Sequence, residues 1–214
     1  MLAVSMETTA LDEKTKRTRE LQKFFLKEWG WFPGKDNSKL VTRLKDYLKE
    51  IPKEWRTVKG KTIYRVLVIK KDSLRRGKTI KLDNRPYSSW STSLKFAEWF
   101  MVSASLFAGS IKSKHSYKAV MEAREEAKQW VTVVIKKEIR PANVIVYLPA
   151  VLKDSIYESQ ETKSYRIKSE GEVIIKNNPY YRTIEMSEIV KVLNGYNKIS
   201  LVQYLKLLKS EKET

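Results

Sequence analysis

The spacing of the apolar residues changes near residue 60, and this change limits the folds that the chain can adopt. Before it, apolar side chains recur at helical spacing over residues 10–29 and 38–50. After it come short β-branched runs typical of strands, at 62–69, 131–139, 143–149, 170–176 and 180–186. Further helices are predicted over 94–108, 116–130 and the closing segment 200–212. Helices followed by a strand-rich body predict an α+β fold rather than a strict alternation of strands and helices.

The chain has 214 residues, which suits one domain with an appendage. We predict an N-terminal helical segment at 1–58 and a second domain at 59–214. No apolar run approaches the roughly 20 residues that span a bilayer. The N-terminus lacks the basic and apolar regions of a signal peptide. The sequence therefore predicts a cytoplasmic protein without a membrane partner.

The net charge, the absence of cysteine and the single histidine limit the functions that the protein can have. With 43 Lys and Arg against 25 Asp and Glu, the formal net charge is +18, which favours nucleic acid or an acidic protein as a partner. The absence of cysteine excludes disulfides and zinc–thiolate sites, and the single histidine, His115, excludes a site with several histidines. We expect no metal cofactor. No glycine-rich phosphate loop occurs among the seven glycines.

Two glutamates precede the β-branched run Val173-Ile174-Ile175. Glu170 and Glu172 are separated by one glycine. If all of 170–176 is a strand, both carboxylates lie on one face. Close carboxylates repel, which separates their pKa values and their chemical roles. The competing interpretation is an exposed strand start whose acids relieve a basic surface.

Two other segments carry polar residues where chemistry could occur. Arg65 lies inside the apolar run 62–69, where a guanidinium needs an anion such as a carboxylate or phosphate. The competing interpretation is an arginine of an edge strand, exposed to solvent. Ser91, Thr92 and Ser93 precede the helix predicted from Leu94. Ser93 is well placed to cap that helix, whereas Ser91 could orient a catalytic carboxylate.

In this order, Arg65, the Ser91-Thr92-Ser93 triplet and Glu170-x-Glu172 resemble the arginine, Ser-Thr-Ser and Glu-x-Glu motifs of mono-ADP-ribosyltransferases, of the bacteriophage or bacterial-toxin type. The resemblance covers about residues 60 to 185 and includes the context STSLKFAEWF. The residue after the arginine is Val66, where many members have glycine. The resemblance implies two packed mixed β-sheets forming an NAD cleft, with the N-terminal helices against one side.

The resemblance also implies a reaction and roles for the residues. NAD would be the substrate, ADP-ribose would pass to a protein acceptor with arginine as the modified residue, and nicotinamide would leave without any metal. Glu172 would stabilise the oxocarbenium-like transition state. Glu170 would act on the acceptor, and Ser91 would orient Glu172. Arg65, with Ser91, Thr92 and Ser93, would bind NAD, and Tyr165 in the loop before Glu170 would contact the acceptor.

Two other functions stay open at this point. A non-enzymatic nucleic-acid-binding protein would account for the positive charge and the interleaved Trp and Tyr residues. An NAD glycohydrolase would use the same residues with water as the acceptor. Release of nicotinamide without transfer of ADP-ribose distinguishes the glycohydrolase from the transferase.

Overall fold

The structure is a computed structural model that describes residues 2–29, 38–77, 79–82, 85–110, 129–153, 155, 167–194 and 197–210, with backbone alone for 2–12, 38 and 103–110. The helices are α1 (Leu2–Lys23), α2 (Ser38–Tyr47), α3 (Lys71–Arg75), α4 (Leu94–Ser110), α6 (Leu148–Lys153), α8 (Pro179–Arg182) and α9 (Leu201–Ser210). The strands are β1 (Thr62–Lys70), β2 (Ile80–Lys81), β3 (Tyr87–Ser91), β4 (Trp130–Glu138), β5 (Val144–Tyr147), β6 (Glu172–Lys176), β7 (Thr183–Ile184), β8 (Ile189–Asn194) and β9 (Asn197–Ile199). A π-helix, η1 (Phe24–Glu28), continues α1, and 3-10 turns form at η3 (Lys53–Arg56), η4 (Pro141–Asn143) and η5 (Met186–Glu188).

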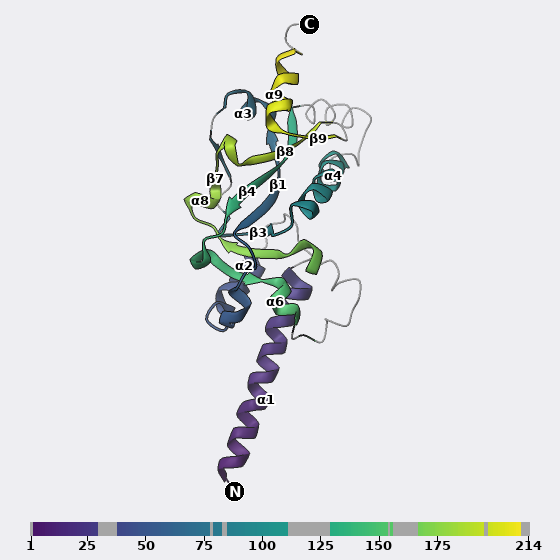
Figure 1. Cartoon of the computed structure of the whole chain (residues 1–214). Coiled ribbons are helices and arrows are strands. Elements are labelled where there is room, and N and C mark those ends of the chain that lie inside the picture. The colour runs from purple at the N-terminus through teal and green to yellow at the C-terminus, as the bar shows by residue number, and fades with distance from the viewer. Residues whose placement is uncertain are drawn as a thin grey trace.

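A seven-stranded sheet in the order β5-β6-β3-β1-β4-β8-β9 forms the centre of the molecule, and β2 pairs with β7 in a second, two-stranded sheet (Figure 1). The chain is therefore a mixture of helices and strands, as an α+β fold requires. Every pairing among the described strands is antiparallel, so the prediction of mixed sheets is wrong. The pattern of apolar residues does not distinguish parallel from antiparallel partners.

The large sheet has two parts that are joined at one residue pair. On one side, β1 and β4 pair along their whole length, from Thr62↔Glu138 to Lys70↔Trp130. On the other, β3 and β6 pair from Tyr87↔Lys176 to Ser91↔Glu172. Between the two parts, the registered pair is Tyr64↔Ser91. No other residue pair is registered between β1 and β3 in the described structure.

Apolar side chains cover both faces of β1, as the sequence predicted. Ile63 and Ile69 belong to a core that also contains Trp90 and Tyr181. Tyr64 and Val66 face the other way and pack with residues of α4 such as Met101, which is fully buried. This alternation follows from the two-residue period of a strand, and it places α4 on one face of the sheet.

The N-terminal helices share a third core with the β3–β5–β6 part of the sheet. Phe24 and Phe25 of η1 and Leu44 of α2 are fully buried. They lie in one cluster with Ile174 of β6 and Val151 of α6. The predicted position of the N-terminal helices against one side of the body is thus present, although α1 itself projects away from it (Figure 1).

Several local predictions differ from the structure. Residues 180–186, predicted as a strand, begin in α8, because Asn178 caps a helical turn by accepting a hydrogen bond from the Tyr181 N–H at 3.2 Å. In sequence, residues 78–93 suit a short strand that runs into a polar segment; the structure has the short strand as β2 and a further, central strand, β3, in the polar part. Residues 150–168 are polar and loop-like in sequence, but α6 extends to Lys153. The strands β8 and β9 were not predicted. Most of the predicted helix 116–130 lies outside the described residues.

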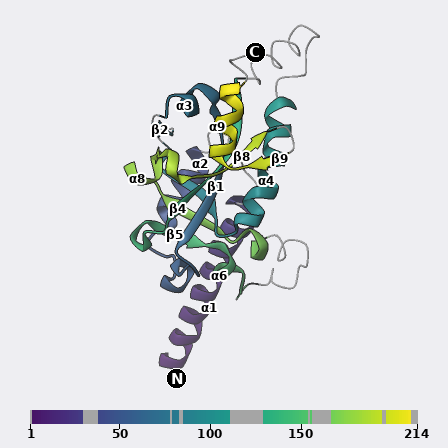
Figure 2. The same cartoon turned by 45° about the horizontal axis from the view of Figure 1, so that its top comes forward.

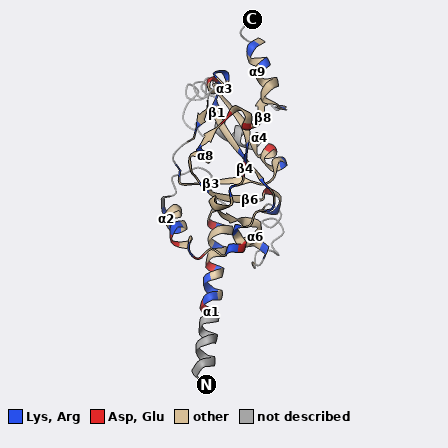
Figure 3. Ribbon diagram, turned by 60° about the vertical axis from the view of Figure 1, so that its left-hand side comes forward, with Lys and Arg blue, Asp and Glu red and all other residues tan. Residues whose placement is uncertain are grey.

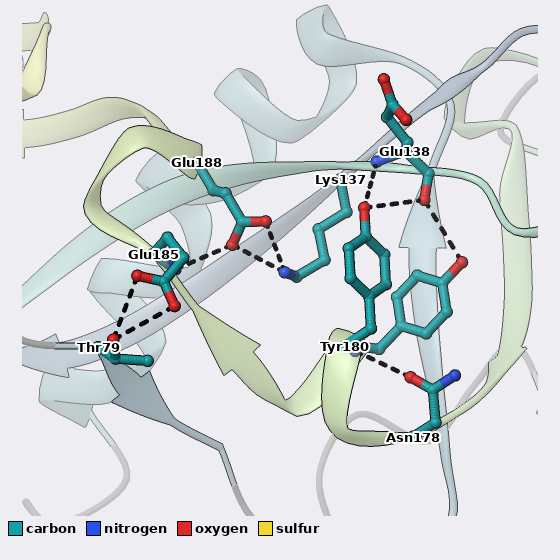
Figure 4. Close-up of polar contacts among 8 residues, drawn as sticks. Thr79, Lys137, Glu138, Asn178, Tyr180, Glu185 and Glu188 are labelled. Carbon is teal, nitrogen blue, oxygen red and sulfur yellow. Dashed lines mark hydrogen bonds and ion pairs between the residues drawn. The ribbon is translucent and has the colours of Figure 1, made fainter.

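A polar cluster holds α8 and η5 against β4 (Figure 4). The Lys137 ammonium, whose side chain is 2% exposed, contacts both carboxylate oxygens of Glu188 at 2.7 Å. It also lies 4.4 Å from the centre of the Tyr180 ring. The Tyr181 hydroxyl accepts a hydrogen bond from the Arg140 N–H at 2.8 Å, and burial raises the pKa of this phenol more than that bond lowers it. The cluster fixes the turn that follows β6.

Candidate functional site

Ser91 and Glu172 lie directly opposite each other where β3 ends and β6 begins. Residues opposite each other in an antiparallel pair have side chains on the same face, with Cβ atoms about 5 Å apart. Both residues are buried, with exposed fractions of 7% for Ser91 and 9% for Glu172. The structure thus brings together two of the predicted site residues, 81 positions apart in the sequence.

The Ser91 hydroxyl bonds to the backbone in front of Glu172. It donates to the Glu170 carbonyl oxygen, a very short contact, and it lies 3.1 Å from the Ser93 carbonyl oxygen. It also accepts a hydrogen bond from the Ser93 N–H at 2.9 Å. Ser91 was expected to orient Glu172 through its carboxylate. In the structure the Ser91 hydroxyl bonds to backbone atoms of Glu170 and Ser93, at the turn before Glu172. A role for Ser91 in orienting the Glu172 carboxylate stays a prediction.

The other two residues of the triplet have structural partners of their own. The Ser93 hydroxyl accepts a hydrogen bond from the Phe96 N–H at 3.1 Å, which confirms the predicted helix cap on α4. The Thr92 N–H donates to the Gly171 carbonyl oxygen at 3.0 Å. The triplet therefore links the end of β3, the start of α4 and the turn before β6.

Gly171 is required at its position for two reasons. Its φ of +57° lies in the left-handed region, which L side chains adopt rarely. A Cβ atom there would also lie 1.9 Å from the Thr92 Oγ1 and 3.2 Å from the Thr92 Cβ. The glycine between the two glutamates lets Thr92 pack directly on the turn.

Glu170 does not share a strand face with Glu172, so that prediction is wrong. Residues 167–170 form a helical turn, Gly171 follows in the left-handed conformation, and β6 starts at Glu172. Strand alternation therefore does not apply between the two glutamates. Glu170 is half-buried whereas Glu172 is buried. The two carboxylates occupy different surroundings.

Arg65 follows the residue that pairs with Ser91. Because Tyr64 is the partner of Ser91, strand alternation directs the Arg65 side chain to the side opposite the one that Ser91 and Glu172 share at this point. Its guanidinium carbon lies 5.8 Å from the centre of the Trp90 ring. We expected Arg65, Ser91 and Glu172 to line one cleft. The structure groups Ser91 with Glu172 and places Arg65 beside Trp90, on the neighbouring strand.

Two residues at this junction were not among the site residues predicted from the sequence. Trp90 is 2% exposed, donates its indole N–H to the Ser88 hydroxyl at 2.8 Å and packs edge-on against the Tyr181 ring. Nothing in its local sequence marks it as the neighbour of Arg65. Gly171 did leave a signal, since a glycine directly before a buried strand is typical of a tight turn. Tyr165, the predicted acceptor contact, lies outside the described residues.

The arrangement can present one buried carboxylate and one more exposed carboxylate at the same turn. Across the part of the chain that the structure describes, no group of three His, Cys, Asp or Glu residues could hold a metal ion. Nor does any helix within those ranges have the length and apolar character to cross a membrane.

No protein-family model, curated protein or solved structure matches the chain.

Proposed function

We propose that the protein is a mono-ADP-ribosyltransferase that moves ADP-ribose from NAD to a protein acceptor. One observation carries the proposal: the buried Glu172 carboxylate stands opposite Ser91, on a turn tied down by the Ser91-Thr92-Ser93 triplet. Three segments that resemble the family motifs are thus on neighbouring strands of one sheet. The proposal also includes an NAD-binding cleft and a protein acceptor in which arginine is the modified residue.

In this proposal the bond between the nicotinamide nitrogen and the ribose C1 breaks, and nicotinamide leaves with the bonding electrons. The ribose then has oxocarbenium character, which a nearby carboxylate stabilises. Glu172 takes this role because its position is fixed by β6 and by the turn before it. The acceptor nitrogen attacks C1 and loses a proton, which Glu170 accepts. The greater exposure of Glu170 supports its contact with a protein substrate.

Arg65 has a separate part in the proposal. It is half-buried and lies next to the registered pair of β1 and β3, on the Trp90 side of the junction. This side lies opposite the one that Ser91 and Glu172 share, so a role for Arg65 at the NAD pyrophosphate requires the dinucleotide to reach around the end of β3. Arg65→Lys keeps the charge and removes the planar fork that fits phosphate. We expect the KM for NAD to rise about tenfold, the effect of losing about 1.4 kcal/mol of binding, while kcat changes little. An unchanged KM would assign Arg65 to packing around Trp90 alone.

The function is tested with NAD labelled in its adenylate part. The purified protein is incubated with the labelled NAD and a bacterial lysate, and two quantities are followed: label on protein and free nicotinamide. A transferase produces both, and Glu172→Gln should remove both. Nicotinamide without labelled protein, in the presence of varied acceptors, would instead identify a glycohydrolase. Neither product would refute the proposal.

A further inference from the structure

A basic surface lies at the end of β1 that is remote from Ser91 and Glu172. Helix α3 follows β1 directly and packs against α9 from the C-terminus (Figure 2). Leu74 of α3 and Leu208 of α9 are buried in the same core, with exposed fractions of 1% and 4%. This packing fixes the position of the two helices relative to each other.

The outer sides of these helices carry five cations, which we call the α3–α9 surface: Lys71, Arg75, Arg76, Lys206 and Lys209. All except the half-buried Lys71 are exposed. Figure 3 colours the Lys and Arg positions of α3 and α9 blue. Asp72 is the one acidic residue within α3 and α9, and it lies 3.7 Å from Arg75. Asp72 offsets one of the five positive charges, which leaves a formal excess of four on this surface.

Some cations elsewhere in the described structure are held by carboxylates: Arg17 bonds to Glu20 and Glu50, Arg43 bonds to Glu28, and Lys137 is held by Glu188. On the α3–α9 surface, Asp72 is the one carboxylate within the two helices that is set against the five cations. Clustered Lys and Arg on one face attract polyanions, because each phosphate they neutralise releases a condensed counterion.

We propose that the α3–α9 surface binds the phosphate backbone of nucleic acid. An acidic protein partner would ordinarily be held by buried aromatic anchors, and neither of these two fully described helices exposes an aromatic side chain. A membrane surface would require an apolar face on α9 for insertion. Tyr204 and Leu208 are buried in the protein, whereas Val202 and Leu207 of α9 are exposed, at 65% and 42%. These two residues are five positions apart and therefore point to different sides of the helix, so they form no continuous apolar face. Contacts to the phosphates of a nucleic acid backbone need only cations spaced along a surface.

The α3–α9 surface lies at a limited distance from the candidate site. Six residues of β1 separate Tyr64, which pairs with Ser91, from Lys70, which precedes α3. At about 3.4 Å a residue this is about 20 Å. A nucleic acid bound at the α3–α9 surface would lie beside the site without occupying it. The inference does not depend on the proposed transferase reaction.

The test is binding of a fluorescent DNA duplex of about 20 base pairs, measured by anisotropy between about 50 and 200 mM salt. The variant replaces Arg75, Arg76, Lys206 and Lys209 by Gln. The control replaces four exposed lysines elsewhere, Lys45, Lys49, Lys53 and Lys59, by Gln. Both variants lose the same formal charge, so a difference between them reports position and not net charge. Circular dichroism and melting temperature establish that both are folded.

We expect the surface variant to bind more weakly and to reduce the slope of log K against log salt by about 3 to 4, roughly one for each cation removed. The control variant should keep a slope close to that of the unsubstituted protein. Equal losses in both variants would overturn the proposal, because binding would then follow net charge. The proposal would also be overturned if the protein did not bind the duplex but did bind vesicles rich in phosphatidylserine, or a polyglutamate chain, in the same assay.

Discussion

The two glutamates of the Glu170-Gly171-Glu172 segment differ in burial and in backbone conformation. Glu172 is 9% exposed and starts a central strand, whereas Glu170 is half-buried and ends a helical turn. The difference gives each carboxylate a separate environment, and the proposed reaction needs two separate roles. Substitutions of Glu170 and Glu172 therefore test the proposed mechanism most directly.

Substitution of each glutamate by glutamine should separate the two roles. Glu172→Gln keeps the shape but removes the negative charge, and should lower both nicotinamide release and protein labelling by about 100-fold or more, by analogy with the loss of one electrostatic stabiliser. Glu170→Gln should abolish labelling while slow NAD hydrolysis persists. Both products are measured for both variants. Identical losses in the two assays would show that the roles are not divided in this way.

Gly171→Ala tests whether the turn depends on contact with Thr92. Gly77 is a matched control, because its φ of +60° is close to the +57° of Gly171 and nothing lies within 4 Å of its added Cβ. Gly77→Ala should cost about 1 kcal/mol of unfolding free energy, from backbone strain alone. Gly171→Ala should cost about 1–3 kcal/mol more, from overpacking on Thr92. Equal costs in urea unfolding would mean that the turn can shift away from Thr92.

At the scale of elements, the single pair between β1 and β3 separates two well-paired parts of the sheet. The site lies at this junction, where Ser91 is the residue common to both pairings. Its surroundings are held from two sides: the triplet ties β3 to the turn before β6, and the cluster around Lys137 fixes the chain after β6. The contribution of the Lys137–Glu188 contact to the stability of the protein can be measured directly.

Removing one partner of the Lys137–Glu188 pair should have unequal effects. Glu188→Gln leaves an ammonium whose side chain is only 2% exposed without its counter-charge, and should cost about 3–5 kcal/mol of unfolding free energy. Lys137→Met leaves a carboxylate whose side chain is 19% exposed and can be solvated, so it should cost less. Urea unfolding of both variants measures the difference. A larger loss for Lys137→Met would contradict the assignment of the buried charge.

At the scale of the whole molecule, α1 projects from a body whose three cores surround the large sheet (Figure 1). Its C-terminal part is attached by the buried side chains of η1 and by Arg17. Arg17 donates from Nε and Nη2 to the two carboxylate oxygens of Glu50, at 2.5 and 2.8 Å. This hydrogen bonding lowers the pKa of Glu50, against the smaller opposite effect of burial.

The lowered pKa gives this attachment a defined pH dependence. A carboxyl group with a depressed folded-state pKa stabilises the fold above its ordinary value of 4.5 and loses that contribution as the pH falls through its folded value. We expect Glu50→Gln to melt at a lower temperature than the unsubstituted protein at pH 7, with the difference shrinking as the pH falls below 4.5 and through the folded-state pKa. Scanning calorimetry at pH 7 and over a series of acid pH values measures it. A difference that persists at the lower pH would assign the effect to packing.

The sequence by itself determined the class of fold and the positions of the longest helices and strands, because helices and half-buried strands have different apolar periods. It placed β1, β4, β5, α4 and α9 correctly, and it identified Ser93 as a helix cap, which depends on contacts within one turn. It also marked Ser91 and Glu172, which the structure brings together.

Tertiary structure alone decided how these pieces meet. The register Tyr64↔Ser91 directs Arg65 toward Trp90, and a shift of one residue would reverse this, so no property of the 62–69 run could predict it. The left-handed Gly171 moved Glu170 out of the strand because Thr92, from a distant segment, packs against that turn. Registers and close approaches depend on partners far away in the chain, and local sequence patterns do not contain them.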